Sequence, residues 1–493
     1  MKISIENFKG IKSLESFELS PITIISGVNS GGKSSLIQLM LMIKQTLENN
    51  YSEQLLSLNK PYVSLGRYKD IIYEGKIKNN PLMWELIFSK KDIPPFLSRT
   101  PFFRKLDQNS VESLTVRVRF ASSAINNPVF VKEFYVGWKL SKKPLIYLKL
   151  DKDYGNIYRV ASNSRLFFKD SYNEFIRERR ITKLTSDLGE WKARIEFDKF
   201  FPFESISTTL DKDAAYAEEY FSPLALQLIN RILATYFERI SYLGPLRDEP
   251  HPFYVNDDDT SKKIGNKGEF AAHILERNSK NKVINYRMRM KKDGVIEYYD
   301  VEETLQDAVN YWICDVFKMA NYIKANPIQS GLMYQIEIQD VSGIKVPINH
   351  VGFGISQILP IVIEGLLSSK KYTLIFEQPE IHLHPNVQSM LFDFLYSLTL
   401  RGKNVIVETH SDHLITRLRR RIAEDTKDEY LTKIKLTFVI KEGYTVLELT
   451  DKGSLTYWPE DFFNQLDQDI RAIVRAQAKK KTLNKSETSE EIR

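Results

Sequence analysis

GVNSGGKS, at residues 27–34, matches the pattern G-x-x-x-x-G-K-S and stands between two segments of different periodicity. The preceding run ITIIS, residues 22–26, is almost continuously apolar, which is typical of a buried strand. The following residues 34–50 are apolar at helical spacing and end in polar, asparagine-rich sequence. A strand, a glycine-rich loop and a helix in this order predict a phosphate-binding loop. This context disfavours the alternative, an ordinary glycine-rich turn before a helix.

The residue types in this loop suit a polyphosphate. Gly27, Gly31 and Gly32 let main-chain N–H groups curve around phosphate oxygens, and the positive end of the helix dipole adds to the attraction. Lys33 would neutralise the β and γ phosphates, and Ser34 would bind Mg²⁺. The nucleotide contacts expected from the loop are Asn29, Ser30, Gly31, Gly32, Lys33, Ser34 and Ser35.

Two apolar runs late in the chain each lead into a side chain suited to a phosphate site. YTLIFEQP, residues 372–379, reaches Glu377, and GKNVIVETHSDHL, residues 402–414, reaches His410. The carboxyl ends of parallel strands meet at one edge of a sheet, so Glu377 is expected beside the phosphate loop as the metal-side acid. His410 is a candidate for contacting a γ-phosphate, and the alternative is that it caps or packs the strand end.

A second glycine-rich helix start lies between the phosphate loop and the acid strand. VGFGISQILPIVIEG, residues 351–365, predicts a turn and an apolar helix, with Ser356 as N-cap and Pro360 near the helix start. Such a helix N-terminus attracts anions, but the chain already has a phosphate loop of its own. We therefore expect Gly354, Ser356 and Gln357 to contact a nucleotide held by another subunit.

Composition indicates a folded protein of ordinary balance. The 493 residues are 42% hydrophobic and 27% charged, and the net charge of +7 permits nucleic-acid binding without arguing for it. The longest apolar runs are too short to cross a bilayer, and the polar start MKISIENFKG does not match a signal peptide, so no membrane partner is expected. The single cysteine, Cys314, excludes an internal disulfide and is expected to be a core thiol in a cytoplasmic protein.

The order GVNSGGKS, VGFGISQ, LIFEQPEIHLHP and VETHSDHL resembles the ABC-type ATPases of the SMC and OLD group, usually called AAA family ATPases. The resemblance implies an α/β fold with an ABC/SMC-type P-loop ATPase head, ATP and Mg²⁺ as cofactors, and a homodimer or higher oligomer that encloses the nucleotides. Lys33 and Ser356 are 356 − 33 = 323 residues apart. In SMC proteins this gap holds a long coiled coil, and the missing heptads predict a compact insertion here.

The resemblance and the local patterns together divide the chain. Strands with period two between residues 82 and 200 predict a strand-rich insertion, and residues 215–239 and 302–325 are expected to be helical. The expected parts are the N-terminal half of the ATPase head at 1–80, the insertion with a helical end at 81–235, the C-terminal half of the head at 236–440, a small C-terminal module at 441–470, and a disordered charged tail at 471–493.

Four further segments resemble a narrower branch of bacterial ATPases that carries an extra C-terminal module. They are SLGRYKDIIYEG (64–75), YLGPLRDEPHPFY (242–254), IGNKGEFAAHIL (264–275) and YWPEDFF (457–463). The wider group includes ATPase subunits of anti-phage defence systems, such as the Septu ATPase and its retron-associated relatives. By analogy we expect a separate effector subunit, a nuclease, because the sequence shows no nuclease constellation of its own.

One position departs from the pattern of the resembled ATPases. There, a glutamate that activates the attacking water follows the metal-side acid, and here Gln378 occupies that position. An amide orients a water but accepts no proton, which predicts slow hydrolysis, ATP-locked dimers or a displaced base. Glu380 is the nearest substitute base, and the alternative is that it caps a helix starting near residues 384–385. The candidate catalytic residues are thus Glu377, Gln378, Glu380 and His410, and the candidate metal ligands are Ser34 and Glu377.

Several other polar or aromatic clusters have a structural explanation beside a functional one. The histidines His382, His384 and His413 are expected to belong to a turn rather than to a metal site. The arginines of LITRLRRRIAED, Arg417, Arg420 and Arg421, are expected on the exposed side of a helix whose apolar face is Leu414, Ile415, Leu418 and Ile422. They and RERRITK (177–183) would be solvated or would contact a nucleic-acid backbone. The expected C-terminal packing anchor is Trp458, Phe462 and Phe463.

The sequence is therefore compatible with three functions. The first is an ATPase that dimerises around nucleotide and drives an effector, and the second is a scaffold that is occupied by ATP and turns it over rarely or not at all. The third is an SMC-like ATPase of DNA repair, for which salt-dependent DNA binding would be the sign.

Overall fold

The structure of the protein is a computed structural model. The residues that it describes are 1–28, 31–49, 54–77, 80–94, 100, 106, 110–122, 128–141, 143–164, 167, 192–207, 223–255, 263–292, 295–328, 331–440, 443–457, 459, 469 and 472–477. Asn29 and Ser30 of the phosphate loop lie outside the described residues. So do the basic segment 177–183 and the aromatic residues Trp458, Phe462 and Phe463.

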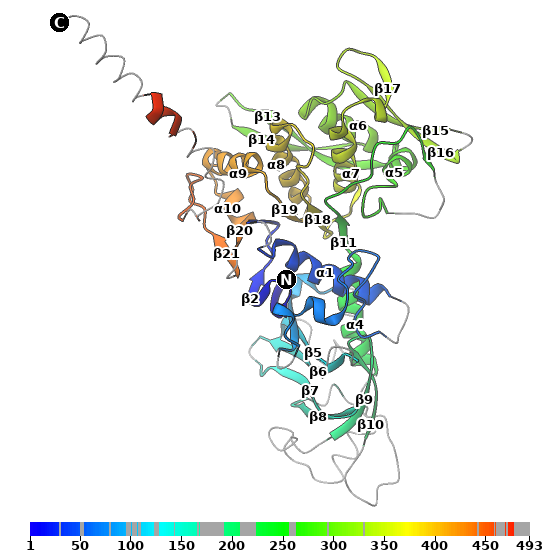
Figure 1. The fold of residues 1–493 in the computed structure, drawn as a ribbon, viewed down its shortest axis with the longest axis vertical. Coiled ribbons are helices and arrows are strands. Elements are labelled where there is room, and N and C mark those ends of the chain that lie inside the picture. The colour runs from blue at the N-terminus through cyan, green and yellow to red at the C-terminus, as the bar shows by residue number, and fades with distance from the viewer. Residues whose placement is uncertain are drawn as a thin grey trace, which may run out of the picture.

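A six-stranded sheet carries the phosphate loop (Figure 1). Its order is β11-β18-β19-β3-β20-β21. The strands are β3 Ile22–Gly27, β11 Ile240–Leu243, β18 Thr373–Glu377, β19 Asn404–Glu408, β20 Ile434–Ile440 and β21 Gly443–Leu447. The strands from β11 to β20 run parallel, and β21 is antiparallel to β20. Glu377 pairs with Glu408 and Glu408 with Ile25, so the carboxyl ends of β18, β19 and β3 lie side by side.

This sheet is covered on both faces because side chains along each strand alternate between two hydrophobic cores. Ile25 and Ile406 belong to the core that contains helix α1, Lys33–Glu48. Their neighbours Ile24 and Val405 belong to the core that contains α7 Phe353–Leu367, α8 Pro385–Leu400 and α9 Asp412–Glu424. The nearly unbroken apolar run ITIIS reflects this two-sided burial. The predicted order of strand, glycine loop and helix is confirmed.

A nine-stranded antiparallel sheet forms the other large layer and extends away from the phosphate loop (Figure 1). Its order is β10-β9-β8-β7-β6-β5-β4-β1-β2. The strands are β1 Lys2–Phe8, β2 Ile11–Glu18, β4 Leu82–Ser89, β5 Val111–Ala121, β6 Phe130–Leu140, β7 Ile146–Tyr154, β8 Ile157–Ser162, β9 Lys192–Asp198 and β10 Phe201–Ser207. The strands expected in the insertion are confirmed, and they share a sheet with the N-terminal hairpin because β4 pairs with β1.

Of two predicted helices, the structure confirms the first over its described residues and differs from the second. In the first segment, helix α4 spans Pro223–Glu238, and residues 208–222 lie outside the described part. The second, predicted over 302–325, is only partly helical: α6 Leu305–Asn310 continues as one π-helical turn, Tyr311–Val316, and strand β15 begins at Tyr322. The left-handed backbone of Lys318, with φ of 55°, lies after the helical turn, and pairing of β15 with β16, Met333–Gln339, makes the remainder extended. Non-local strand pairing therefore overrides the local helical pattern.

The remaining elements complete the half of the molecule that contains α7 and α8 (Figure 1). They are α5 Ala271–Asn278, α10 Glu429–Lys433, the hairpin β13 Lys282–Met290 and β14 Ile296–Thr304, and the small sheet of β12 Tyr254–Val255, β15 Tyr322–Ile328, β16 Met333–Gln339 and β17 Lys345–Pro347. Cys314 is half-buried in the π-helical turn. Within the described residues, no helix has the length and apolar content needed to span a membrane.

Candidate functional site

The phosphate loop follows β3 and depends on close contact with strand β20. A Cβ at Gly27 would lie 2.3 Å from the Val439 carbonyl oxygen, so no larger residue fits there. Gly32 precedes α1 with a left-handed φ of 93°, a conformation that glycine adopts without strain. The Lys33 Nζ donates to the carbonyl oxygens of Gly27 at 3.1 Å and Val28 at 2.7 Å. The ammonium group is thus held inside the curve of the loop.

Ser34 meets a carboxylate that the sequence reasoning did not select. Its Oγ donates to Glu408 Oε1 at 3.0 Å, and Glu408 is the last residue of β19. The Glu408 side chain is buried, and its second oxygen, Oε2, has no hydrogen-bond partner among the described residues. The available signal was an acid directly at the end of the apolar run NVIVE, the same pattern that selected Glu377.

Glu377 ends the neighbouring strand β18 and lies beside Glu408. Burial raises the pKa of Glu377 to about 8, and repulsion by the Glu408 carboxylate adds to the rise, whereas a hydrogen bond from Tyr242 opposes it. Burial likewise raises the pKa of Glu408, against the opposing effects of Ser34 and Lys33. Two buried carboxylates at adjacent strand ends make this edge of the sheet favourable for a cation.

Gln378 adopts a left-handed backbone conformation directly after the acid strand. Its φ is 44°, which is unusual for a residue other than glycine. The main chain is fixed from two sides: Gln378 N–H donates to Glu408 O at 2.7 Å, and the Arg247 Nη2 donates to the carbonyl oxygens of Glu377 and Gln378 at 2.9 and 3.3 Å. The turn after β18 is thus held by contacts to its main chain.

Arg247 is a second residue that the sequence reasoning missed. It lies in the loop after β11, which is adjacent to β18 in the sheet, and its side chain is only 5% exposed. Burial lowers the pKa of Arg247 to about 10, and the Glu380 carboxylate partly opposes this effect. Its Nε and Nη1 make no hydrogen bond to the described residues. The only signal was an arginine just after the short apolar run of YLGPLRDEP.

Glu380 is buried at the same edge, and the alternative that it caps the next helix is wrong. The N-cap of α8 is His384, whose side chain accepts from Asn386 N–H at 3.3 Å. Glu380 Oε1 instead accepts from the His410 N–H at 2.6 Å, which ties the turn after β18 to the end of β19. Burial raises the pKa of the Glu380 carboxyl.

His410 is exposed and lies within electrostatic range of the phosphate loop. Partial desolvation lowers the pKa of its imidazole, and the charge of Lys33 lowers it further. The structure therefore brings Lys33, Ser34, Glu377, Glu380 and His410 to one edge of the sheet, with Gln378 in the turn that connects them.

The start of α7 differs from the prediction. Its N-cap is Gly352, and Ser356 lies inside the helix with its hydroxyl donating to Phe353 O at 2.7 Å. Pro360 also lies in the helix interior and not near its start. It packs against the loop before α5, where a Cβ at Gly268 would lie 2.5 Å from its ring, and this tertiary contact places the proline where propensity alone would not.

Gly354 and Gln357 lie on the first turns of α7, close to the turn after β18. A Cβ at Gly354 would lie 3.2 Å from His382 O, and Gln357 Nε2 donates to Asp248 O at 3.5 Å. Phe353 is 53% exposed and its ring lies 6.0 Å from that of His382. The helix start thus presents a bulky apolar side chain to the surface.

The prediction that the arginines of α9 all lie on the exposed side of the helix is wrong. Arg421 is buried, and both Arg421 and Arg417 form ion pairs with Asp393 of α8 at 2.7 Å. Only Arg420 is exposed, and it pairs with Glu424. The wholly buried Asp393 draws the two guanidinium groups inward because a buried carboxylate needs cationic partners. The apolar face of Leu414, Ile415, Leu418 and Ile422 is confirmed as buried.

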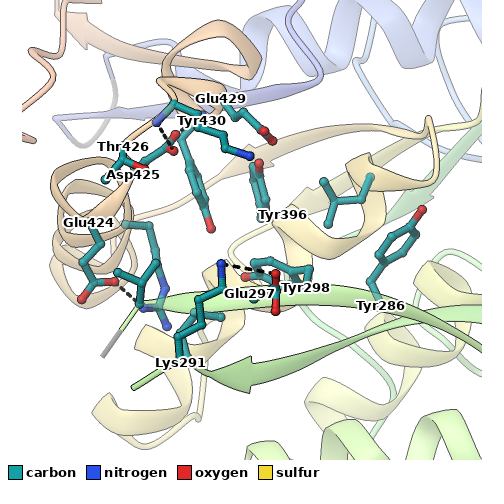
Figure 2. A pocket seen from close by; sticks show the side chains of 15 residues that line it. Tyr286, Lys291, Glu297, Tyr298, Tyr396, Glu424, Asp425, Thr426, Glu429 and Tyr430 are labelled. Carbon is teal, nitrogen blue, oxygen red and sulfur yellow. Dashed lines mark hydrogen bonds and ion pairs between the residues drawn. The ribbon is translucent and has the colours of Figure 1, made fainter. Parts of the chain in front are cut away.

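A cavity of about 300 Å³ opens beside this cluster, between the β13–β14 hairpin and α8, α9 and α10 (Figure 2). Tyr396 and Tyr430 stack at its wall with ring centroids 4.0 Å apart. Its charged groups pair with one another, Lys291 with Glu297 at 3.3 Å and Arg421 with Glu424 at 2.6 Å. The cavity therefore combines tyrosine side chains with charged side chains, several of which pair with one another.

Comparisons with known proteins agree with the geometry of the phosphate loop. A model of the AAA ATPase domain matches residues 1–238 and 251–415. A curated relative, the energy-coupling factor transporter ATP-binding protein EcfA of Methanosphaera stadtmanae, is 28% identical over 124 residues, which cover 25% of this chain and 42% of that relative. The chain thus spans less than half the length of this relative.

Solved structures of SMC heads are also similar. An SMC head bound to the C-winged helix domain of ScpA matches with a TM-score of 0.38 and 12% identity over 91% of this chain and 97% of that one. The Thermotoga maritima SMC head matches with a TM-score of 0.36 and 11% identity over 91% of this chain and 98% of that one. A third match is the Pyrococcus furiosus SMC head with an extended coiled coil, bound to the C-terminal domain of ScpA. Its TM-score is 0.36, with 11% identity over 97% of this chain and 98% of that one.

The sheet order, the phosphate loop after β3 and the acid at the end of β18 give an α/β P-loop ATPase fold. The AAA ATPase domain model spans more than half of the chain and includes the phosphate loop and both acid strands. The chain belongs to the AAA ATPase domain family.

Proposed function

We propose that the protein is an ATPase that binds Mg²⁺ and ATP at the phosphate loop, dimerises around the nucleotide and turns it over slowly. The observation that supports this most strongly is the convergence of Lys33 and Ser34 with Glu377 and Glu408 at neighbouring strand ends. The similarity to an ATP-binding transporter protein supports ATP as the nucleotide.

The residues at this edge fit a Mg²⁺ ion. The Ser34 hydroxyl and the Glu377 and Glu408 carboxylates supply oxygen atoms, which are the ligands that Mg²⁺ prefers in proteins. Glu408 Oε2 is buried and has no hydrogen-bond partner among the described residues, so an acceptor is available there. When bound, Mg²⁺ would neutralise charge on the phosphate oxygens during phosphoryl transfer.

The side chains would divide the remaining tasks. Lys33 would exchange its contacts with the Gly27 and Val28 carbonyls for the β and γ phosphates, and His410 would contact the γ-phosphate from the end of β19. Gln378 would orient the attacking water by its amide, in a turn fixed by Arg247. Since an amide takes no proton, the water would be held in place and would attack without a strong general base, so turnover would be slow.

Glu380 is a poor replacement for the missing base in this arrangement. One of its carboxylate oxygens is occupied by the His410 N–H, and the side chain is only 7% exposed, which limits the access of a water to it. This observation also favours a second candidate function, a scaffold that is occupied by ATP and releases it without significant hydrolysis. In both cases the state of the dimer follows nucleotide occupancy.

The start of α7 supports dimerisation through the nucleotide. Phe353 is 53% exposed, and Leu246, which precedes Arg247, is 72% exposed, so two bulky apolar residues lie at the surface near the site. A second subunit would cover them and place the start of its own α7, at Gly354, against the nucleotide. The side chains of Ser356 and Gln357 are buried within the subunit, so they would act there only through the position of the helix. The resemblance of four segments to defence-associated ATPases leads us to propose that the dimer regulates a separate effector subunit, a nuclease, in the cytoplasm during anti-phage defence.

Equilibrium binding of a fluorescent ATP analogue, with the mass of the complex measured by light scattering, tests this proposal. Wild-type protein should bind the analogue and double its mass with ATP and Mg²⁺. Lys33→Ala should lose binding, while the matched control Lys345→Ala, which removes an exposed lysine on β17, should not. An analogue that binds wild type and Lys33→Ala equally would refute the nucleotide site.

A second pair of variants separates nucleotide binding from dimerisation. Phe353→Ser should bind ATP normally and fail to double its mass, because it removes apolar surface that a partner subunit would cover. Val341→Ser removes a residue that is 74% exposed in the small sheet region and should dimerise like the wild type. A nucleotide-bound wild-type monomer at high protein concentration would contradict the dimer.

A further inference from the structure

Glu408 accepts a hydrogen bond from the serine of the phosphate loop. Its Oε1 lies 3.0 Å from the Oγ of Ser34, the hydroxyl that the phosphate-loop pattern assigns to Mg²⁺. Ligands of octahedral Mg²⁺ lie about 2.1 Å from the ion, so two neighbouring ligands at right angles are about 3.0 Å apart. The separation of these oxygens therefore equals that of two adjacent ligands of one ion.

The surroundings of the two acids at the strand ends differ. Glu408 contacts the phosphate loop through the Ser34 hydroxyl, whereas Glu377 ends the next strand out from the loop. Glu408 Oε2 has no hydrogen-bond partner among the described residues although its side chain is only 3% exposed. Strand register fixes Glu408 between Glu377 on one side and Ile25 at the end of β3 on the other. Glu408 is therefore the acid on the strand adjacent to the phosphate loop.

We propose that Glu408 is a direct ligand of the divalent cation, together with Ser34, and that Glu377 supports the same ion from the next strand. Glu377, the acid on β18 that the sequence motif selects, would then not be the direct ligand, and Glu408 on β19 would take that role. The inference rests on the proposed function, because it concerns the metal that accompanies the nucleotide. It predicts that the metal-binding acid of this protein lies at the end of β19.

Binding of Mn²⁺ in the presence of a non-hydrolysable ATP analogue tests the assignment without any turnover. The free-ion signal of Mn²⁺ in electron paramagnetic resonance gives its dissociation constant directly. Glu408→Gln keeps the size of the side chain and an acceptor for the Ser34 hydroxyl, so the fold should persist, as thermal unfolding would show. We expect a loss of Mn²⁺ affinity of roughly tenfold to a hundredfold. Affinity for the analogue in EDTA should stay within about twofold, because the nucleotide contacts remain.

Glu337→Gln is the control for the change in net charge, since it also neutralises a glutamate, one that pairs with Lys345 in the small sheet. Its Mn²⁺ affinity should stay within about threefold of wild type, since only the direct ligand is removed in Glu408→Gln. Equal losses in both variants would mean that net charge, not ligation, sets the affinity, and would overturn the assignment. Unchanged Mn²⁺ affinity in Glu408→Gln would overturn it as well.

The same experiment separates this inference from the proposed function. Wild-type protein that binds neither the analogue nor Mn²⁺ with it would refute the nucleotide site itself. Wild-type protein that binds both, with Glu408→Gln indistinguishable from it, would refute only the role of Glu408.

Discussion

Replacing Gln378 with glutamate is the most informative single change in the site. The structural contacts of Gln378 are made by its main chain, through its N–H to Glu408 O and through its carbonyl to Arg247. Gln378→Glu therefore leaves the left-handed turn and the length of the side chain unchanged. The substitution adds a proton acceptor at the position where the water would be activated.

The expected gain follows from the environment of the new carboxylate. A positioned general base contributes roughly 10²–10⁴-fold to a rate. The new group would stand near Glu377 and Glu408, whose pKa values are raised by burial, so its own pKa would also rise and only part of it would be ionised at neutral pH. We therefore expect about a hundredfold increase in kcat, which corresponds to about 2.7 kcal/mol in the barrier.

Steady-state phosphate release measures this effect. Gln339→Glu, at the end of β16, introduces the same charge in the small sheet and should leave kcat unchanged. The increase in Gln378→Glu should grow with pH, since ionisation of the new carboxyl is required. An unchanged or lower kcat, with normal ATP affinity, would refute the view that Gln378 limits turnover.

Other changes test the surroundings of the site and the fold. Arg247→Ala should lower kcat roughly tenfold to a hundredfold with little change in ATP affinity, because the turn at Gln378 loses its anchor, and Arg247→Lys should restore part of the rate. Asp393→Ala should lower the free energy of unfolding by about 3–5 kcal/mol in chemical denaturation, since Arg417 and the buried Arg421 lose the carboxylate that they share; a loss below about 1 kcal/mol would contradict this. Burial lowers the pKa of Lys403 to about 7, so the unfolded state binds more protons above that pH, and stability should rise by about 2 kcal/mol from pH 7 to pH 9. Lys403→Met should abolish that rise, and an identical pH dependence in both proteins would contradict the assignment.

The sequence predicts the parts of the site that local patterns define. The glycines and Lys33 lie in one short loop between a strand and a helix, so spacing alone places them together. Glu377 was found because it ends an apolar run whose neighbours in the chain suit a buried strand. These features depend on residues that are close in sequence.

The contributions of Glu408 and Arg247 depend on the order of strands in the sheet. β19 lies between β18 and the phosphate-loop strand, and β11 lies on the other side of β18. No local pattern states which strands are neighbours. The acid that ends NVIVE, Glu408, could therefore not be assigned to the strand beside Ser34, and Arg247 could not be placed at the turn of Gln378.

Burial by distant elements explains the remaining errors. Arg421 lies on the polar side of α9 by periodicity, yet Asp393 on α8 draws it into the interior. Ser356 has the residue type of an N-cap, but α7 begins at Phe353, before it. In both cases a tertiary contact or a helix boundary, and not propensity, decides the outcome.

Single-turnover hydrolysis of ATP by an excess of the purified wild-type protein, with Lys33→Ala and Gln378→Glu measured in parallel, tests the central claim most directly. We predict that wild type binds ATP and converts it slowly to ADP, that Lys33→Ala neither binds nor converts it, and that Gln378→Glu converts it faster. Conversion by Lys33→Ala at the wild-type rate, or wild-type conversion as fast as that of Gln378→Glu, would contradict the claim that this phosphate loop with Gln378 forms a slow ATPase site.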